Sequence, residues 1–167
     1  TGNSVGIKTV DPQAIVDKLP QVSRRLDSIF LEHQDALVLI SKEDRVDGVI
    51  YADPPYMMTE KVYDVRFLPE DHIILHDKAR SCKGYVIISY GYHEQIFDLY
   101  KDDFFIVSLK RTNPLSQTEG STFQELIITN YDPSPYLNKQ LDIFGQASDA
   151  MWEPVILNRP HRILKVD

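Results

Sequence analysis

The sequence predicts an α/β fold built on an open, mostly parallel sheet that ends in an antiparallel hairpin. Apolar runs typical of buried strands alternate along the chain with segments of helical periodicity. The last two strand candidates, residues 104–110 and 123–131, are joined by a connection containing Asn, Pro, Ser and Gly, which favours a long hairpin loop. In an open α/β sheet, ligands bind at the carboxyl ends of the strands.

The first elements rest on local patterns of different strength. Residues 14–26 carry apolar side chains at helical spacing, and Pro20 is expected to bend or split that helix. Residues 28–33 are a strand candidate, whereas residues 36–41 fit either a strand or a helix. The apolar run at residues 46–53 predicts a strand.

The central elements have clearer signals. Residues 69–81 begin with a proline and two acidic residues and continue with helical spacing, which predicts a helix. Residues 84–90 are rich in Val and Ile without polar alternation, as expected of a strand buried on both faces. A short helix is predicted at residues 94–100.

Length and composition restrict the class of protein. A chain of 167 residues is sufficient for one domain of ordinary size. With a single cysteine it forms no intrachain disulfide, and no apolar run is long enough to cross a bilayer, so we expect a cytoplasmic protein without a membrane partner. The net charge of −7 opposes generic attraction to a phosphate backbone, so any nucleic-acid contact must use local basic residues or another chain.

The tetrapeptide Asp53-Pro54-Pro55-Tyr56 closes the predicted strand at residues 46–53. Pro54 ends strand pairing and Pro55 stiffens the turn, so the Asp53 carboxylate and the Pro54 carbonyl are held in a fixed relation. Two such acceptors suit the two hydrogens of an exocyclic amine, and the Tyr56 ring can cover the face of a flat nucleobase. The alternative is an ordinary Pro-Pro turn after a buried strand, with Asp53 capping a neighbouring group.

Other polar residues are expected at the same edge of the sheet. Asp35 and the sequence Tyr90-Gly91-Tyr92 also follow strand candidates. Three strand ends are therefore expected to meet at one site. The segment Ser89-Tyr90-Gly91 is either a turn at the substrate or an ordinary strand exit.

Several blocks of the sequence together resemble one family of enzymes. The blocks are Tyr51-Ala52-Asp53-Pro54-Pro55-Tyr56, Tyr63, Phe67, Asp71-His72, Gly84-Tyr85-Val86-Ile87-Ile88-Ser89, Arg111-Thr112 and Glu125-Leu126-Ile127-Ile128-Thr129-Asn130-Tyr131. They look like the catalytic half of Dam-type adenine-specific DNA methyltransferases, and the resemblance covers residues 14–133. It implies a Rossmann-like sheet ending in a reversed hairpin. It also implies methyl transfer from S-adenosylmethionine to the exocyclic nitrogen of an adenine turned out of double-stranded DNA.

The resemblance assigns roles at the target base. Asp53 and the Pro54 carbonyl would hold the adenine amine. Pro55 completes the catalytic tetrapeptide, and Tyr56 would stack on the flipped ring. Tyr90, at the next strand end, is a further candidate for contact with the nucleic acid.

The resemblance also implies contacts to the cofactor and to the DNA backbone. Asp35 and the backbone of Ala36 would meet the adenine of S-adenosylmethionine, and Asp53 would border the cofactor as well. The loop that follows Lys110 would lie over the target base, so Arg111 and Lys110 are candidate phosphate ligands. A sulfonium methyl is already activated, so the reaction needs alignment of the amine, methyl carbon and sulfur, without a metal or a protein nucleophile.

Three features of the family are not found in these 167 residues. They are a Gly-rich strand–turn around the methionine part of the cofactor, an amino-terminal aromatic-and-lysine segment, and a base-reading domain before the tetrapeptide. We therefore expect the carboxyl-terminal portion of such an enzyme, or half of a split enzyme whose missing motifs come from a separate chain. Residues 1–133 would form a partial catalytic domain and residues 134–167 an extension packed on it. The isolated chain is expected to bind the cofactor poorly and to be inactive.

Other candidate sites are weaker. His72 and His76 are four residues apart in a predicted helix and lie beside Asp71 and Asp77, a set that could ligate a metal. A solvated helix face is favoured and no metal site is predicted, because no third ligand has a convincing spacing. Cys82, before a predicted buried strand, is expected to be a packing residue.

Two other functions stay open. Similar methyltransferases with an acidic-or-Asn-Pro-Pro-Tyr motif methylate RNA bases or protein glutamine. A non-catalytic interaction module would keep the site without the cofactor half. The negative charge weakens the case for DNA, whereas the loop at Arg111-Thr112 and the block at residues 125–131 favour it.

Overall fold

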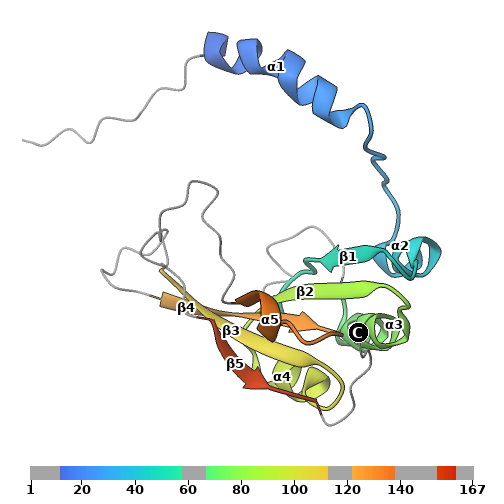
Figure 1. The fold of residues 1–167 in the computed structure, drawn as a ribbon, viewed down its shortest axis with the longest axis vertical. Helices are drawn as coiled ribbons and strands as arrows, with labels where there is room; N and C mark the ends of the chain where they lie inside the picture. Colours follow the sequence, from blue (N-terminus) through green and yellow to red (C-terminus); the bar gives the residue numbers. More distant parts are fainter. Residues whose placement is uncertain (1–11, 58–66, 113–121, 138–153, 161–167) are drawn as a thin grey trace, which may run out of the picture. The chain divides into compact units, whose positions relative to one another are not determined.

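The computed structural model describes residues 12–57, 67–112, 122–137 and 154–160 (Figure 1). The chain forms two compact units, Thr1–Gln34 and Asp35–Asp167, and each is described by itself. All predicted site residues belong to the second unit. None of the helices in the described ranges combines the length and apolar character that a membrane span requires.

The first unit contains one helix, α1 (Pro12–Leu26), among its described residues. The helix prediction is confirmed, and Pro20 lies inside the helix without splitting it. The strand predicted at residues 28–33 is wrong, because this segment has no regular structure. Its side chains Phe30 and Leu31 are 94% and 81% exposed. An apolar run does not form a strand without a neighbouring strand to complete its hydrogen bonds.

The second unit is built on a five-stranded sheet with the order β1-β2-β4-β3-β5. The strands are β1 (Val49–Ala52), β2 (Tyr85–Gly91), β3 (Phe105–Thr112), β4 (Thr122–Thr129) and β5 (Val155–Asn158). β1 and β2 pair in parallel, whereas β2–β4, β3–β4 and β3–β5 are antiparallel. The predicted open α/β sheet and its antiparallel hairpin, β3–β4, are confirmed.

The sheet is mixed rather than mostly parallel. β1, β2 and β3 share one direction, but β4 returns between β2 and β3 and therefore separates these two strands. β5, from the predicted extension at residues 134–167, adds antiparallel to the outer edge of β3. Among the described strands, β1 and β2 are consequently the one parallel pair.

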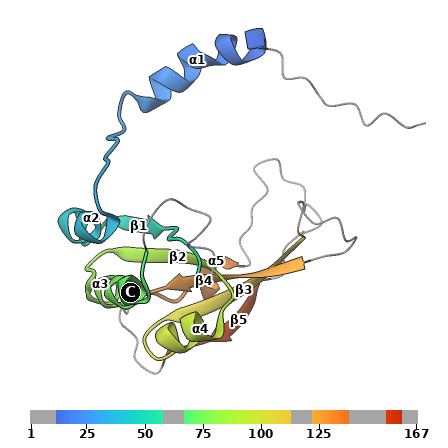
Figure 2. The same cartoon turned by 180° about the vertical axis from the view of Figure 1, so that it is seen from behind.

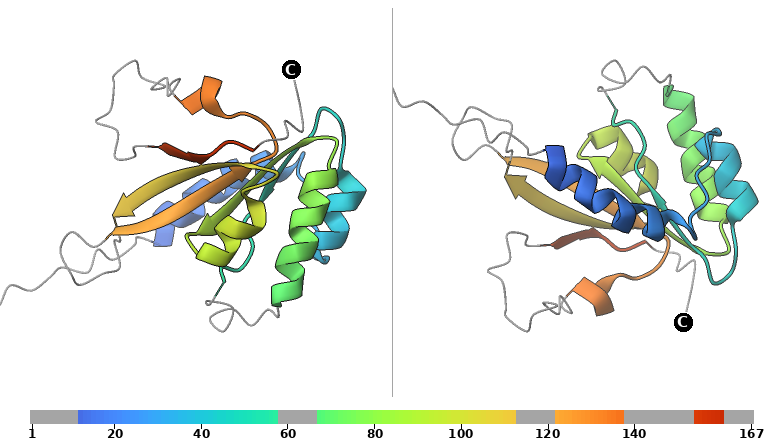
Figure 3. Two further views of the ribbon diagram at one scale, coloured as in Figure 1. Left: turned by 90° about the horizontal axis from the view of Figure 1, so that it is seen from below. Right: turned by 90° about the horizontal axis from the view of Figure 1, so that it is seen from above.

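The helices of the second unit are α2 (Ala36–Glu43), α3 (Pro69–Ser81), α4 (Glu94–Tyr100) and α5 (Ser134–Leu137). The predicted helices at residues 69–81 and 94–100 are confirmed, and the ambiguous segment after Asp35 is a helix. α3 and α4 cover one face of the sheet, and α5 lies on the other face (Figure 3). α2 packs beside α3.

The core lies between the sheet and the helices α3 and α4, which Figure 2 shows from behind. Alternate residues of β2 point into it, so Val86, Ile88 and Tyr90 are fully or almost fully buried. Cys82 is part of the same apolar cluster, which confirms its predicted packing role.

The two histidines of α3 are buried, so the prediction of a solvated helix face is wrong. α3 turns this face toward the sheet, where His72 Nδ1 lies 2.8 Å from the Tyr90 hydroxyl. His76 Nδ1 lies 2.9 Å from Asp77 Oδ1, and its Nε2 lies 3.5 Å from Asp103 Oδ2. In the described part of the chain, no group of three or more His, Cys, Asp or Glu side chains could hold a metal ion.

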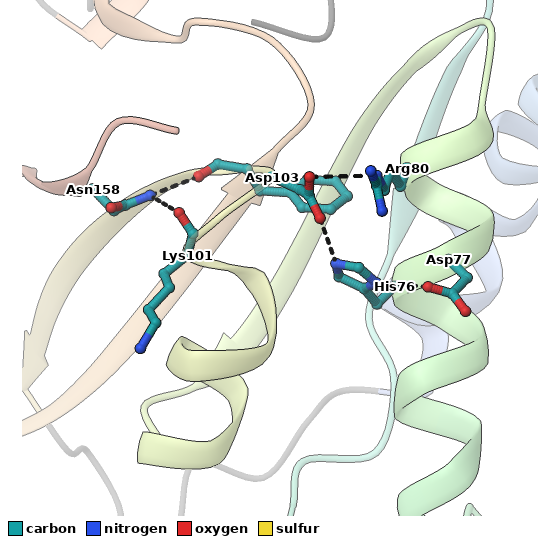
Figure 4. Close-up of polar contacts among 7 residues, drawn as sticks. His76, Asp77, Arg80, Lys101, Asp103 and Asn158 are labelled. Atoms are coloured by element: carbon teal, nitrogen blue, oxygen red, sulfur yellow. Dashed lines mark hydrogen bonds and ion pairs between the residues drawn. The ribbon is translucent and has the colours of Figure 1, made fainter. Parts of the chain in front are cut away.

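A polar cluster joins α3 to the turn before β3 (Figure 4). Asp103, in that turn, also forms an ion pair with Arg80, with 3.3 Å between Arg80 Nε and Asp103 Oδ1. Asn158 of β5 donates to the backbone carbonyls of Lys101 and Phe104 in the same turn. The turn between α4 and β3 is therefore held from both sides.

Two polar side chains fix the start of β2. The Asp44 carboxylate accepts hydrogen bonds of 2.9 Å from the backbone amides of Lys83 and Gly84. The buried Asn130 side chain accepts from the Val86 amide at 2.9 Å and donates to the Gly84 carbonyl at 3.0 Å. The Asp44 contacts hold the start of β2 against the segment that precedes β1, and the Asn130 contacts hold it against the end of β4.

Gly84→Ala is expected to destabilise the protein. A Cβ at Gly84 would lie 2.4 Å from the Arg45 carbonyl oxygen and 2.7 Å from the Gly48 carbonyl oxygen, and neither backbone atom can move away cheaply. The expected loss is about 1–3 kcal/mol of the free energy of unfolding, the cost typical of overpacking. Urea unfolding of the full chain, followed by circular dichroism, measures it.

Gly48→Ala is the matched control for this substitution. Its Cβ would lie 3.2 Å from the Arg45 carbonyl oxygen, a contact that a small shift relieves. The Gly48→Ala variant should therefore lose less stability. Equal unfolding midpoints for the Gly84→Ala variant and the unmodified protein would contradict the close approach.

Candidate functional site

The parallel pairing of β1 and β2 places Asp53 beside Ser89. Ala52 pairs with Ile88, and Asp53 and Ser89 are the next residues along each strand. Ser89 Oγ donates a hydrogen bond of 2.9 Å to Asp53 Oδ1. The exposed carboxylate that follows β1 is therefore anchored to the neighbouring strand.

A second hydroxyl extends this contact. Tyr51 Oη lies 3.0 Å from Ser89 Oγ, so a hydrogen-bonded chain runs from Tyr51 through Ser89 to Asp53. By strand alternation these side chains lie on the face opposite the one that carries Ile88 and Tyr90 into the core. These hydrogen bonds therefore lie on the face of the sheet away from α3 and α4.

The ring of Tyr56 packs on the end of β2. A Cβ at Gly91 would lie 2.8 Å from Tyr56 Cδ2, so glycine leaves the space that the ring occupies. The ring centroid is 6.2 Å from that of Tyr90, with an angle of 43° between the planes. Tyr56 is partly buried, and its position beside Asp53 is set by this contact with β2.

Two carboxylates act on the Tyr56 phenol. Burial raises the pKa of Tyr56, and the negative charges of Asp53 and Glu125 raise it further, whereas a hydrogen bond with Ser89 lowers it. Glu125 lies on β4, directly across from Gly91. The site thus combines a neutral phenol with two nearby acids at neutral pH.

Asp35 caps a helix instead of ending a strand. Its Oδ1 accepts hydrogen bonds from the amides of Leu37 at 2.7 Å and Val38 at 3.2 Å, at the amino end of α2. Ala36 is the first residue of that helix. Because α2 ends just before β1 begins, we infer that its amino end points toward the edge of the sheet where β1 ends.

The basic pair lies on the hairpin. Leu109 of β3 pairs with Glu125 of β4, which in turn pairs with Gly91, the last residue of β2. Lys110 and Arg111 follow Leu109, so they lie beyond the end of β2. The projecting hairpin is visible in Figure 3. Lys110 is exposed. Most of the loop that the sequence places over the target base, residues 113–121, lies outside the described residues.

Tyr90 does not fit its predicted contact with nucleic acid. The side chain is 0% exposed, and its hydroxyl is hydrogen-bonded to His72 in the core. The Tyr90 side chain points into the core because side chains alternate along β2, and that of Ser89 lies on the opposite face of the sheet.

Sequence reasoning did not assign a role at this site to Ser89, Tyr51 or Glu125. It interpreted residues 89–91 as either a turn at the substrate or an ordinary strand exit. The contacts of Ser89 and Tyr51 depend on the β1–β2 register, and the place of Glu125 depends on β4 lying next to β2. Period-two alternation along β2 is the one local signal that separates Ser89 from the core residues on either side of it.

Comparison with known proteins does not assign the chain to a family. No protein-family model matches the sequence, and no curated protein matches it.

Asp53→Asn is expected to lower the pKa of Tyr56. The substitution removes a negative charge that raises this pKa and keeps an oxygen for the Ser89 hydroxyl. Glu125→Gln should lower the pKa by a smaller amount, since Glu125 makes the smaller contribution. NMR titration of the protein labelled with carbon-13 on the tyrosine ring measures both.

Asp98→Asn is the control for this titration. Asp98 is an exposed carboxylate on α4 that pairs with Lys101 and does not act on Tyr56. Its substitution should leave the Tyr56 titration unchanged. A Tyr56 pKa that stays constant in the Asp53→Asn variant would show that the phenol and the carboxylate are not neighbours in solution.

Proposed function

We propose that this chain carries the target-base half of an S-adenosylmethionine-dependent methyltransferase acting on the exocyclic amine of adenine in DNA. The observation that carries the proposal is the Asp53 carboxylate, anchored by Ser89 at the end of β1, with the Tyr56 ring held beside it on Gly91. An acid and a ring at a strand end are the groups needed to grip an amine and to cover a flat base.

The acceptors are arranged for an amine with two hydrogens. In the part of the chain that the structure describes, the hydrogen bond to Asp53 comes from Ser89 and engages Oδ1. Asp53 Oδ2 and the Pro54 carbonyl are then the two oxygens proposed to accept the amine hydrogens. Pro54 and Pro55 stiffen the chain between the carboxylate and Tyr56, so these groups keep their relation to each other.

The reaction needs positioning more than acid–base chemistry. Hydrogen bonds to both amine hydrogens would move the nitrogen lone pair out of conjugation with the ring, so the amine becomes the nucleophile. The amine proton becomes acidic only after the methyl group has moved, and Asp53 is the group proposed to accept it. Holding the reacting atoms in line supplies the main acceleration.

The arrangement of strands is consistent with the resemblance. The resemblance implies a sheet ending in a reversed hairpin, and β4 does return antiparallel between β2 and β3. Asp35 and Ala36, proposed to meet the adenine of the cofactor, begin the helix that leads into β1. This agreement supports the proposal at the level of topology.

The hairpin offers the proposed contact to the DNA backbone. The strand register places Lys110 and Arg111 about 10–13 Å further than Ser89 along the strand direction. Their strand, β3, lies about 14 Å from β1 across the sheet. That span is comparable to the groove width of a DNA duplex, about 12 Å. A base turned into the Asp53 site could leave its flanking phosphates near the basic pair.

The proposal is tested with the full chain alone and with the product of the neighbouring gene, because the cofactor motifs of the family are not in this sequence. Calorimetry measures S-adenosylmethionine binding, and transfer of a tritiated methyl group is followed on duplex DNA, on RNA and on a glutamine peptide. Transfer to adenine in the duplex supports the proposal. Transfer only to RNA, or only to the peptide, would show that this molecule is the substrate instead of DNA. No binding or transfer in any mixture favours an interaction module.

Asp53→Ala is expected to abolish methyl transfer, lowering the rate by at least about a hundredfold, because it removes a contact that aligns the amine. The matched control is Asp47→Ala, which removes an exposed carboxylate from the turn before β1. Activity of the Asp53→Ala variant within a few-fold of the unmodified protein would overturn its assigned role.

Tyr56→Ala is expected to weaken binding of DNA with an unpaired target adenine by about 1–3 kcal/mol, the scale of aromatic stacking on a base. Tyr56→Phe keeps the ring and should keep most of this affinity. Fluorescence anisotropy with a labelled duplex measures the difference. If the Tyr56→Ala variant binds as tightly as the Tyr56→Phe variant, the stacking role is wrong.

A further inference from the structure

Ser89 occupies a fixed and enclosed place in the sheet. Its strand pairs with β1 on one side and with β4 on the other, where Ser89 lies opposite Ile127. The residue is only 6% exposed. A buried hydroxyl on a strand bonded along both edges has little freedom to move, which makes it a suitable anchor.

The direction of its hydrogen bonds follows from the chemistry of the partners. An ionised carboxylate only accepts, so the single Ser89 proton goes to Asp53 Oδ1, 2.9 Å away. The Tyr51 hydroxyl, 3.0 Å from Ser89 Oγ, must then donate to it. Both hydroxyls thus point their protons toward the carboxylate, and such a chain strengthens each of its bonds.

Asp53 needs an anchor because it lies on the exposed end of β1. A free aspartate side chain at such a position samples several rotamers. The bond from Ser89 to Oδ1 favours one rotamer, in which Oδ2 is the oxygen that does not contact Ser89. The Asp53 charge also acts on the Tyr56 phenol, so the acid and the ring of the site are neighbours.

We propose that Ser89, supported by Tyr51, is a positioning residue that holds the Asp53 carboxylate in the orientation that grips the target amine. This inference rests on the proposed function, in which Asp53 is the group that contacts substrate. Ser89 itself does not touch the reacting atoms. It acts by fixing which oxygen of Asp53 faces them.

The first test is the kinetics of methyl transfer in the mixture that supports activity. Ser89→Ala should lower kcat by about tenfold to a hundredfold, the effect of a misplaced reacting group. The KM for DNA should change by less than about threefold, because an interaction used only in the transition state has been lost. Ser89→Thr keeps the hydroxyl and should restore kcat to within about threefold, and Tyr51→Phe should give an intermediate loss.

Ser108→Ala is the matched control. Ser108 is equally buried in the same sheet, and its hydroxyl bonds to Gln124 instead of Asp53. Loss of a buried hydroxyl from a strand should therefore affect folding similarly in both variants, but only the Ser89→Ala variant should lose kcat. An unchanged kcat for the Ser89→Ala variant, or an equal loss for the Ser108→Ala variant, would overturn the proposal.

A second measurement separates this inference from the proposed function. Three-bond couplings in NMR spectra report the χ1 rotamer of Asp53 in the full chain, with or without activity. The anchor is supported if the coupling constants are averaged over several rotamers in the Ser89→Ala variant but keep the values of one rotamer in the Ser89→Thr variant. Couplings that stay fixed in the Ser89→Ala variant overturn it. Absence of methyl transfer by the unmodified protein in every mixture tested would instead reject the proposed function and leave the NMR result to decide whether Ser89 anchors Asp53.

Discussion

The parallel register of β1 and β2 is the constraint on which the candidate site depends. Asp53 meets Ser89 only because Ala52 pairs with Ile88, and the Tyr56 ring fits only because the end of β2 is a glycine. A slip of one residue would turn every side chain of β2 to the opposite face, which would bury Gly91 and expose the core positions. The contacts at the entry to β2 oppose such a slip, because the Asp44 carboxylate accepts from the Gly84 amide and a residue with a side chain would not fit at Gly84.

Polar groups on β2 are divided between two environments. On the core face, the Tyr90 hydroxyl is satisfied by His72 of α3, so a polar atom is buried without being left unpaired. On the other face, the Ser89 hydroxyl is satisfied by Tyr51 and Asp53 at the end of β1. The first contact joins a helix to the sheet, and the second orients an exposed acid. Adjacent residues of one strand therefore contribute separately to stability and to the proposed chemistry.

The sequence predicted what depends on local pattern. The helices at residues 69–81 and 94–100 have caps and periodicity of their own, and the structure has both with these bounds. The strand predicted at residues 28–33 was wrong because a strand also needs a neighbouring strand, which no local pattern supplies. The tetrapeptide at Asp53 follows β1 as expected, but Ser89 and Glu125 belong to neighbouring strands and could be found only from the strand order and register. Tyr90 was placed at the site from its position near a strand end, without regard to the face on which it lies.

The charges of the site also indicate how a negatively charged chain could meet a nucleic acid. Asp53 and Glu125 both act on the Tyr56 phenol, so this end of the sheet repels phosphate and attracts hydrogen-bond donors. An exocyclic amine is such a donor, whereas a backbone phosphate accepts only. Under the proposed function, contact with phosphate would occur elsewhere, and Lys110 on the projecting hairpin is exposed at a distance that a duplex can bridge. A base that has left the helix can approach the acids while its backbone stays with the basic residues, but a base still inside the duplex would bring its phosphates toward the carboxylates. The same charges that oppose general binding to DNA would therefore favour the flipped base over the stacked one.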